Sequence, residues 1–493
     1  MLPASTVLLG ILLWMGVAGQ TPMAGTPPGA KAAAAFYSPD QVQQVHLTID
    51  PGDLRRMTAA LPERIQVPVS FRWRDILIDR ASVQFKGNSS SNPRQAHKRS
   101  FLVKFPENRR FLGLRQVSFD NAIQFGSLFS EPIITSILRD HGMPAHRANH
   151  ARLYLNGEYR GVYVNVERID EVFLASHLPD PQGSLFKVDL GGPGSNLQYL
   201  GDRPDLYSQA FEPKNRAAKN RPDSLVDFIR RVNQTGPGEF PRVLESVFES
   251  DDFLRTTAVM LFAGAFDQLT GWNPHNYFLY HDSTRNRWRY LPWDLDVGFC
   301  ETAFGKIRVL DDWHAAWPAP RTGPPNPLLE RIIADPGLLK KYRSEARKIL
   351  DSSFQPEKLC KVFDTMHALL RGDLKTDPFP PRRATVPDDR DYDGIIASMK
   401  DFVRKRHAAA VRQLEEPGER PRRQPGPPGL TAELVARIQQ IQKRAEETRR
   451  NGGDIAPVAR VMEKLGPAIE AGRMDEAESI IREATRRLDA LGK

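Results

Sequence analysis

Cysteine is scarce in this sequence, which contains two thiols, Cys300 and Cys360, among 493 residues. Two thiols exclude a framework of several disulfides and a zinc site built from cysteines. They leave room for one bridge, and their separation in the sequence does not say whether it forms. At this length the chain is too long for one small core and long enough for a two-lobed domain with appendages.

Long apolar runs are missing after the first twenty residues. The run Val7–Val17 is followed by the small residues Ala18 and Gly19 and is too short to span a bilayer comfortably. This pattern favours a signal peptide at residues 1–20 over a buried N-terminal helix, although no Lys or Arg precedes the run. We expect an exported protein (periplasmic, cell-surface or extracellular) with no transmembrane segment.

A strong excess of one charge is also absent. The formal net charge is +9, from 69 Lys and Arg against 60 Asp and Glu. The arginines are spread along the chain and no DNA- or RNA-binding motif is found, so no nucleic acid partner is expected. The mild basic excess favours anionic partners such as phosphates, and a solvated basic surface is the alternative.

Segments rich in proline and glycine divide the chain. Between them, period-two patterns and an Asn156-Gly157 turn predict a strand-rich first half, and helical periodicity predicts a mostly helical second half. We therefore expect an α+β fold. The helices at the C-terminal end form a tail that is expected to contact a partner protein. The expected parts are a signal peptide at 1–20, a disordered linker at 21–40, a main domain at 41–414, a Pro-rich linker at 415–430 and the tail at 431–493.

The densest group of chemically useful residues lies in residues 266–299. Asp267 follows a predicted helix, Asn276 begins a predicted hairpin, and Asp294 and Asp296 lie at its end. Because a hairpin brings its two ends together, Asn276 and Asp294 are expected to lie close enough to share an ion. Carboxylate and amide oxygens suit Mg²⁺ or Mn²⁺, and phosphoryl transfer uses such a set. The alternative is structural, with Asp267 ending the helix and Asp294 anchoring a turn.

Several motifs in the same order resemble the spore-coat protein H (CotH) kinase family along nearly all of Val45–Leu414. They are the loop Val83–Ser90, the strand Lys98–Phe105, the hairpin Leu155–Glu167, the segments His275–Tyr280 and Pro292–Asp296, and a closing region at Asn326–Leu329 and Arg404–Arg406. The resemblance implies an atypical protein-kinase-like two-lobed fold, with a sheet-rich N-lobe, a helical C-lobe and a C-terminal helical appendage.

The resemblance also implies roles for individual residues. Asp267 matches the catalytic Asp, which orients or deprotonates the acceptor hydroxyl. Asp294 matches the metal-binding Asp, with Asn276 as the metal-side amide, and Asp296 matches a further acid whose role is open. The link from Asp267 to the amide is longer than in the family, so Asn273 competes with Asn276. The tyrosine after Asn276 favours Asn276.

Three further residues are implied on the nucleotide side. Lys98 and Lys104 are the hypotheses for phosphate contact, and the resemblance does not decide between them. Glu167 is expected near the nucleotide base. The alternatives are exposed strand lysines and a structural salt bridge.

Together these assignments imply a metal-dependent phosphotransferase. It would move the γ-phosphate of ATP, with Mg²⁺ or Mn²⁺, to a hydroxyl acceptor, expected to be a Ser or Thr of an extracytoplasmic or surface protein. Two other classes stay open. One is a two-metal phosphoester hydrolase, and the other is a catalytically silent surface or coat-type binding module attached through the C-terminal helices.

Overall fold

The computed structural model describes residues 33–87, 90–93, 98–122, 127–272, 274–303, 307–322, 325–379, 381, 383, 386, 388, 391–423, 432–450, 453–465, 468 and 474–491. The predicted signal peptide, most of the predicted linker at 21–40 and Asn273 lie outside these residues. Within the described ranges, no helix combines the length and the apolar character needed to cross a membrane.

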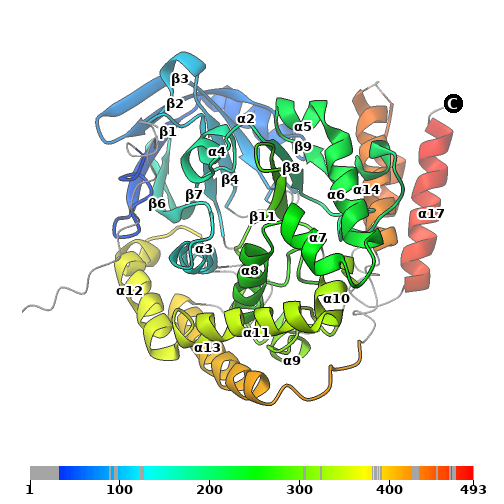
Figure 1. Ribbon diagram of the computed structural model, residues 1–493. Helices are drawn as coiled ribbons and strands as arrows, with labels where there is room; N and C mark the ends of the chain where they lie inside the picture. The colour runs from blue at the N-terminus through cyan, green and yellow to red at the C-terminus, as the bar shows by residue number, and fades with distance from the viewer. Residues whose placement is uncertain are drawn as a thin grey trace, which may run out of the picture.

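Seven strands of the first half close into a barrel (Figure 1). Their order is β1-β2-β3-β4-β5-β7-β6, with β1 and β6 parallel and the other neighbours antiparallel. Buried positions alternate with less buried ones along β1 and β2, as in strands with one face on a core. The strands are β1 (Gln43–Thr48), β2 (Val67–Trp73), β3 (Ile76–Lys86), β4 (Ser100–Lys104), β5 (Gln116–Asp120), β6 (Ala148–Leu155) and β7 (Glu158–Val166).

The sheet-rich first half is confirmed, and its closure into a barrel is a feature that the sequence did not predict. The hairpin that the Asn156-Gly157 turn predicted is present between β6 and β7, and a second hairpin with Arg74-Asp75 at its turn joins β2 and β3. Short helices occupy the connections: α2 (Pro51–Ala59), η1 (Glu107–Arg109), α3 (Ser130–Asp140) and α4 (Glu171–His177).

The chain packs onto the barrel earlier than predicted. Phe36 is fully buried, and its ring meets those of Trp73 and Phe111 edge to face. Its carbonyl accepts hydrogen bonds from the side-chain amides of Asn149 and Asn165 at 3.0 and 3.2 Å. The disordered linker predicted over residues 21–40 is therefore wrong for its end, because a buried aromatic ring holds that end against the barrel.

A second sheet begins the other half of the main domain. Its order is β11-β10-β8-β9, and all of its pairs are antiparallel. The strands are β8 (Ser184–Val188), β9 (Glu212–Pro213), β10 (Tyr277–Asp282) and β11 (Arg287–Pro292), and a small separate pair is formed by β12 (Thr302–Ala303) and β13 (Ile307–Arg308).

Helices make up most of this half, as predicted. They are η2 (Pro204–Tyr207), α5 (Arg216–Asn220), α6 (Pro222–Gln234), α7 (Phe240–Val247), α8 (Ser250–Ala263), α9 (Val309–Asp312), α10 (Pro327–Ala334), α11 (Pro336–Asp351), α12 (Pro356–Lys375) and α13 (Tyr392–Glu415). Helix α8 is almost entirely buried and packs against α3, α11, α13 and β11, so it forms the centre of this half. Cys300 and Cys360 are both buried and do not form the one bridge that the sequence allowed.

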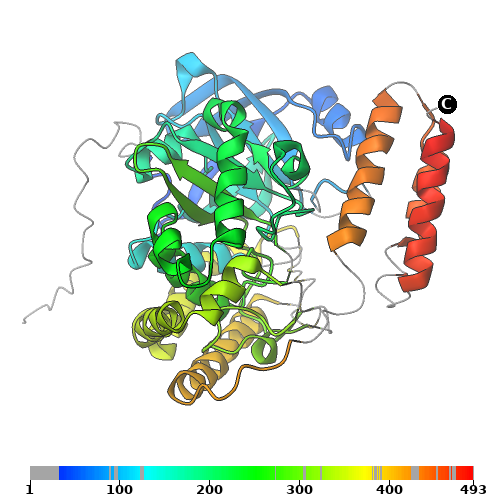
Figure 2. The same cartoon turned by 45° about the vertical axis from the view of Figure 1, so that its right-hand side comes forward.

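The tail has a hydrophobic core of its own. Helices α14 (Ala432–Arg450), α15 (Ala456–Met462) and α17 (Met474–Leu491) enclose apolar side chains that include Leu434, Ile441, Ile481 and Leu488. Figures 1 and 2 both show α14 and α17 side by side, at one edge of the molecule.

Candidate active site

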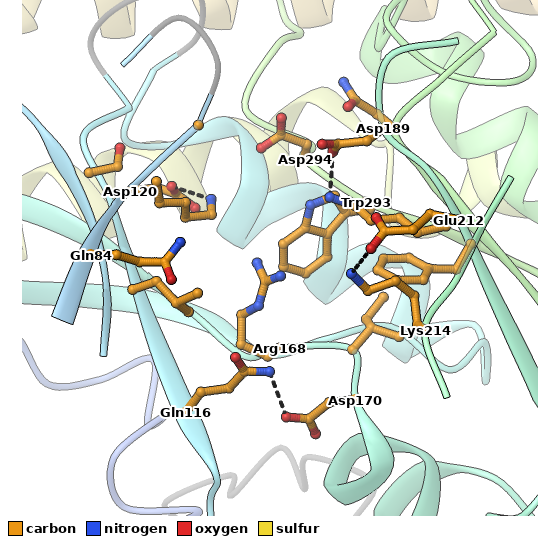
Figure 3. A pocket seen from close by; sticks show the side chains of 18 of the residues that line it. Gln84, Gln116, Asp120, Arg168, Asp170, Asp189, Glu212, Lys214, Trp293 and Asp294 are labelled. Atoms are coloured by element: carbon orange, nitrogen blue, oxygen red, sulfur yellow. Dashed lines mark hydrogen bonds and ion pairs between the residues drawn. The ribbon is translucent and has the colours of Figure 1, made fainter. Parts of the chain in front are cut away.

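A cavity of about 980 Å³ lies between the barrel and the second sheet. Strands β3, β4 and β5 line it on the barrel side, and β8, β9 and the residues after β11 line it on the other. In Figure 3, side chains from the two sides face one another, with Gln84, Gln116 and Asp120 on one side, Asp189, Glu212 and Lys214 on the other, and Arg168, Trp293 and Asp294 between them.

Asp267 lies in the loop that follows α8. The helix ends at Gly264, whose φ of +67° is left-handed, and a Cβ there would come within 2.7 Å of the side chain of Val309. The Asp267 carboxylate oxygen Oδ2 lies 3.3 Å from Nδ2 of Asn276 and 3.3 Å from Nε2 of His275. The structure thus brings Asp267 and Asn276 together at the cavity.

Asn276 and Asp294 lie side by side at the two ends of the β10–β11 hairpin. Tyr277 pairs with Pro292, and the amide of Trp293 donates a hydrogen bond to the carbonyl of Asn276. Asn276 and Asp294 both have left-handed backbones, with φ of +55° and +58°. Positive φ is uncommon for residues other than glycine, and such strain tends to collect at functional sites.

Asp294 and Asp296, at this end of the cavity, are buried close to other carboxylates. Burial raises the pKa of Asp294 to about 6, and Asp120 and Glu131 add to the rise while Lys86 opposes it. Burial, followed by the charge of Asp294, raises the pKa of Asp296 well above its usual value. A cation bound here would relieve both effects.

These residues have the chemistry of a divalent-cation site. Carboxylate and amide oxygens are hard ligands, and burial together with neighbouring carboxylates raises the pKa values of Asp294 and Asp296. In the described part of the chain, however, no three His, Cys, Asp or Glu side chains already converge as a metal cluster. The donor set therefore resembles sites in which one or two carboxylates bind Mg²⁺ together with water and phosphate, more than an all-protein cage.

Two lysines that sequence analysis did not select line the cavity, and the charges of both act on Asp294. Lys86 ends β3 and pairs with Asp120, and Lys187 on β8 pairs with Asp189. Their ammonium groups lie 5.8 and 6.0 Å from the Trp293 ring centroid. Lys86 belongs to the loop motif Val83–Ser90, so the motif could have identified it as a site residue. Lys187 had no comparable signal.

Of the two lysines that were selected, Lys104 lines the cavity and Lys98 does not. Lys98 is fully buried; its ammonium group pairs with Asp377 at 3.1 Å and donates to the carbonyl of Val162 at 2.5 Å. Its position therefore does not support the phosphate-contact hypothesis, and the ion pair explains why a lysine is buried there. Lys104 remains at the cavity as a half-buried side chain.

Glu167 is buried and does not line the cavity either. Its carboxylate accepts hydrogen bonds of 2.9 Å from the backbone and side chain of Arg147, and His177 lies 3.4 Å away. Burial alone would raise the pKa of Glu167, but Arg147 and His177 hold it well below its usual value. This is the structural salt bridge that the sequence left open as the alternative.

Arg168, the residue after Glu167, occupies the middle of the cavity. Its guanidinium lies 4.6 Å from the centroid of the Trp293 ring, a cation–π distance, and Figure 3 shows the two side chains stacked between the walls.

A family model described as CotH kinase protein matches residues 83–410, and the chain belongs to this family.

Two relatives support this assignment. Inner spore coat protein H of Bacillus subtilis (strain 168) is 23% identical over 358 residues, which cover 72% of this chain and 94% of that protein. Spore coat protein homolog 1 of Rhizopus delemar is 22% identical over 302 residues, which cover 57% of this chain and 46% of that protein. The match with the second relative therefore spans less than half of its length.

Proposed function

We propose that this protein is a metal-dependent phosphotransferase that moves the γ-phosphate of ATP to a hydroxyl group of a protein. The observation that carries the proposal is the meeting of Asp267, Asn276 and Asp294 at one cavity that Lys86 and Lys187 also line. Membership of a family described as kinase proteins supports it.

Each side chain has a role in this proposal. Asp294 and the Oδ1 atom of Asn276 would hold Mg²⁺ or Mn²⁺, since Nδ2 of Asn276 already donates to Asp267. The bound cation would offset the charge of the phosphates. Lys86 and Lys187 would exchange their carboxylate partners for phosphate oxygens.

Asp267 is the proposed acceptor-side residue. Its side chain is 31% exposed, so a hydroxyl group can approach it, and Asn276 and His275 fix its orientation. It would orient the hydroxyl and accept its proton. Asp296, two residues beyond Asp294, would add negative charge once the cation is bound, because the cation would lower its raised pKa.

The proposal extends to the fold and to the acceptor. The barrel and the helical half would correspond to the N-lobe and C-lobe of an atypical protein kinase. The relatives are named as spore coat proteins, so we propose a Ser or Thr of a coat-type or surface protein as the acceptor and an exported site of action.

Thermal unfolding with Mg²⁺·ATP, with Mg²⁺ alone and with neither tests the proposal. We expect Mg²⁺·ATP to raise Tm well beyond Mg²⁺ alone, because a ligand that binds the folded state stabilises it. Lys86→Met should remove most of that increase. Lys214→Met is the matched control, because Lys214 lines the same cavity and also pairs with a carboxylate, Glu212, whereas it is the charge of Lys86 that acts on Asp294.

The outcome also separates the other two classes of function. No nucleotide-dependent shift in the wild type would overturn the proposal in favour of a silent binding module. Release of phosphate from a phosphorylated substrate without any nucleotide would favour the hydrolase.

A further inference from the structure

Asp377 joins the helical half to the barrel just after α12. Its side chain is 1% exposed, and its Oδ2 atom accepts hydrogen bonds from the ammonium group of Lys98 at 3.1 Å and from the amide of Val162 on β7 at 2.8 Å. Its Oδ1 atom accepts from the amide of Phe379 at 3.0 Å. The ammonium group of Lys98 thus balances the charge of the carboxylate, and the backbone amide of Val162 ties the carboxylate to the barrel sheet.

The barrel strand is shaped to receive this carboxylate. Gly161 on β7 has a φ of +93°, and a Cβ at this position would lie 2.2–2.4 Å from the carboxylate atoms of Asp377. Only glycine leaves room for that approach. Gly161 of the Leu155–Glu167 hairpin motif is therefore required because any side chain there would collide with the carboxylate of Asp377.

Arg383, six positions after Asp377, contacts the backbone just after Val297, which lines the other side of the cavity. It is 2% exposed, and its Nη2 atom donates to the carbonyls of Gly298 and Phe299, the latter at 3.1 Å. These carbonyls lie just after Asp294 and Asp296.

The segment that Arg383 contacts is held at other points too. The amide of Ser127 donates to the carbonyl of Asp296 at 3.2 Å, and the amide of Phe299 donates to the carbonyl of Ala263 at the end of α8 at 2.7 Å. Contacts with the barrel-side connection, with α8 and with Arg383 therefore converge on the few residues after Asp294.

We propose that Asp377 and Arg383 are positioning residues that set the distance between the barrel lysine Lys86 and the acidic segment Asp294–Asp296. Asp377 is one anchor, which fixes β7 and Lys98. Arg383 is the other anchor, which fixes the backbone just after the acidic segment. The inference rests on the proposed function, because this distance matters when a cation on Asp294 and an ammonium group on Lys86 bind one nucleotide. It assigns Lys98 to the anchor and not to the phosphates.

The decisive comparison is between Asp377→Asn, Lys98→Met and the double variant. Either single change leaves one charge buried without its partner, which is costly, whereas the double variant removes both charges. We expect both single variants to lower Tm and to weaken Mg²⁺·ATP affinity, with phosphate transfer reduced by up to about 100-fold, the loss typical of a 1 Å misplacement. The double variant should recover Tm, affinity and transfer together, because no unpaired charge is left and the Asn oxygen can still accept from the Val162 amide, which keeps position 377 attached to β7.

Hydrogen exchange gives a readout that does not depend on nucleotide. In Asp377→Asn, and in Arg383→Lys, which cannot keep the two-carbonyl geometry, the amides of residues 293–299 should exchange faster than in the wild type. Asp373→Asn is the matched control, since Asp373 joins α12 to Arg152 on the barrel without contacting Lys98 or the acidic segment. It should leave exchange at residues 293–299 and nucleotide affinity unchanged.

Three results would overturn the inference. A double variant that recovers Tm but not transfer would mean that Lys98 contacts the phosphates. Single variants that lower Tm but keep full affinity and normal exchange at residues 293–299 would make the anchors purely structural. An Asp373→Asn variant that matches Asp377→Asn in every readout would remove the specificity of the anchor. Absence of nucleotide binding in the wild type, with the exchange effects intact, would instead overturn the proposed function.

Discussion

The amide of Trp293 donates a 2.9 Å hydrogen bond to the carbonyl of Asn276, and this contact closes the β10–β11 hairpin at the cavity. Gln268 supports the same point, because its side-chain amide donates to the carbonyl of Trp293 at 2.8 Å. Asn276 and Asp294 are therefore held next to each other by backbone bonds that do not use their own side chains. Their oxygens are left for a ligand.

Asp294→Ala should abolish Mg²⁺-dependent nucleotide binding and turnover without unfolding the protein. Burial raises the pKa of Asp294 to about 6, so its charged form is unfavourable in the folded state and its removal should not lower Tm. Calorimetry with Mg²⁺·ATP, radiolabel transfer and thermal unfolding measure the three quantities. A variant that labels protein from ATP at nearly the wild-type rate would show that Asp294 does not hold the metal.

Asp267→Asn should reduce turnover by roughly 10²–10⁴-fold, the usual contribution of a general base, while nucleotide affinity stays nearly constant. The reason is that Asp267 faces the acceptor and keeps its contact with Asn276 as an amide. Affinity and transfer rate are measured on the same preparation.

The pair of variants also separates two mechanisms. In a two-metal hydrolase both carboxylates would bind metal, so Asp267→Asn and Asp294→Ala would weaken metal binding equally. That equality would contradict the roles proposed here even for an active kinase.

Removal of Thr431–Lys493 should leave phosphate transfer to a generic acceptor largely unchanged. The tail encloses its own apolar cluster, and its described ion pair with the barrel side, Arg449 with Glu63 at 3.1 Å, is a partly exposed one of the kind that contributes little stability. Comparison of kcat and Tm for the truncated and full chains checks this. A truncated chain that fails to fold or loses activity would show that the tail is part of the catalytic core.

Stability should fall as the pH drops from 6.5 toward 4, and His150 should account for part of the loss. Burial lowers the pKa of His150 from 6.5 to about 4, although its hydrogen bond to the carbonyl of Leu128 opposes the shift. In this pH window the unfolded chain binds a proton that the folded chain does not, so stability declines by up to roughly 1.4 kcal/mol per pH unit. Urea unfolding of the wild type and of His150→Gln measures the difference. Equal pH slopes in the two proteins would show that His150 does not titrate this way.

Local sequence was enough for the elements and for part of the site. The Asn156-Gly157 turn and the hairpin that carries Asn276 and Asp294 depend on neighbouring residues, so spacing and turn chemistry predicted them. The nearness of Asn276 and Asp294 followed from the same hairpin. Lys187 and Asp120 reach the cavity from strands far apart in the chain, and no local pattern pointed to them.

What the sequence determined by itself is the order of strands and helices, the family motifs and the types of residue available for chemistry. The tertiary structure alone decided that β1 and β6 close the barrel, that Phe36 packs onto it and that Lys98 turns away from the cavity. The physical reason is that each of these depends on a partner distant in sequence: β6 for β1, Trp73 and Phe111 for Phe36, and Asp377 for Lys98. A lysine next to a strand, as Lys98 is, can pair with a phosphate or with a buried carboxylate, and the tertiary structure decides which of the two it meets.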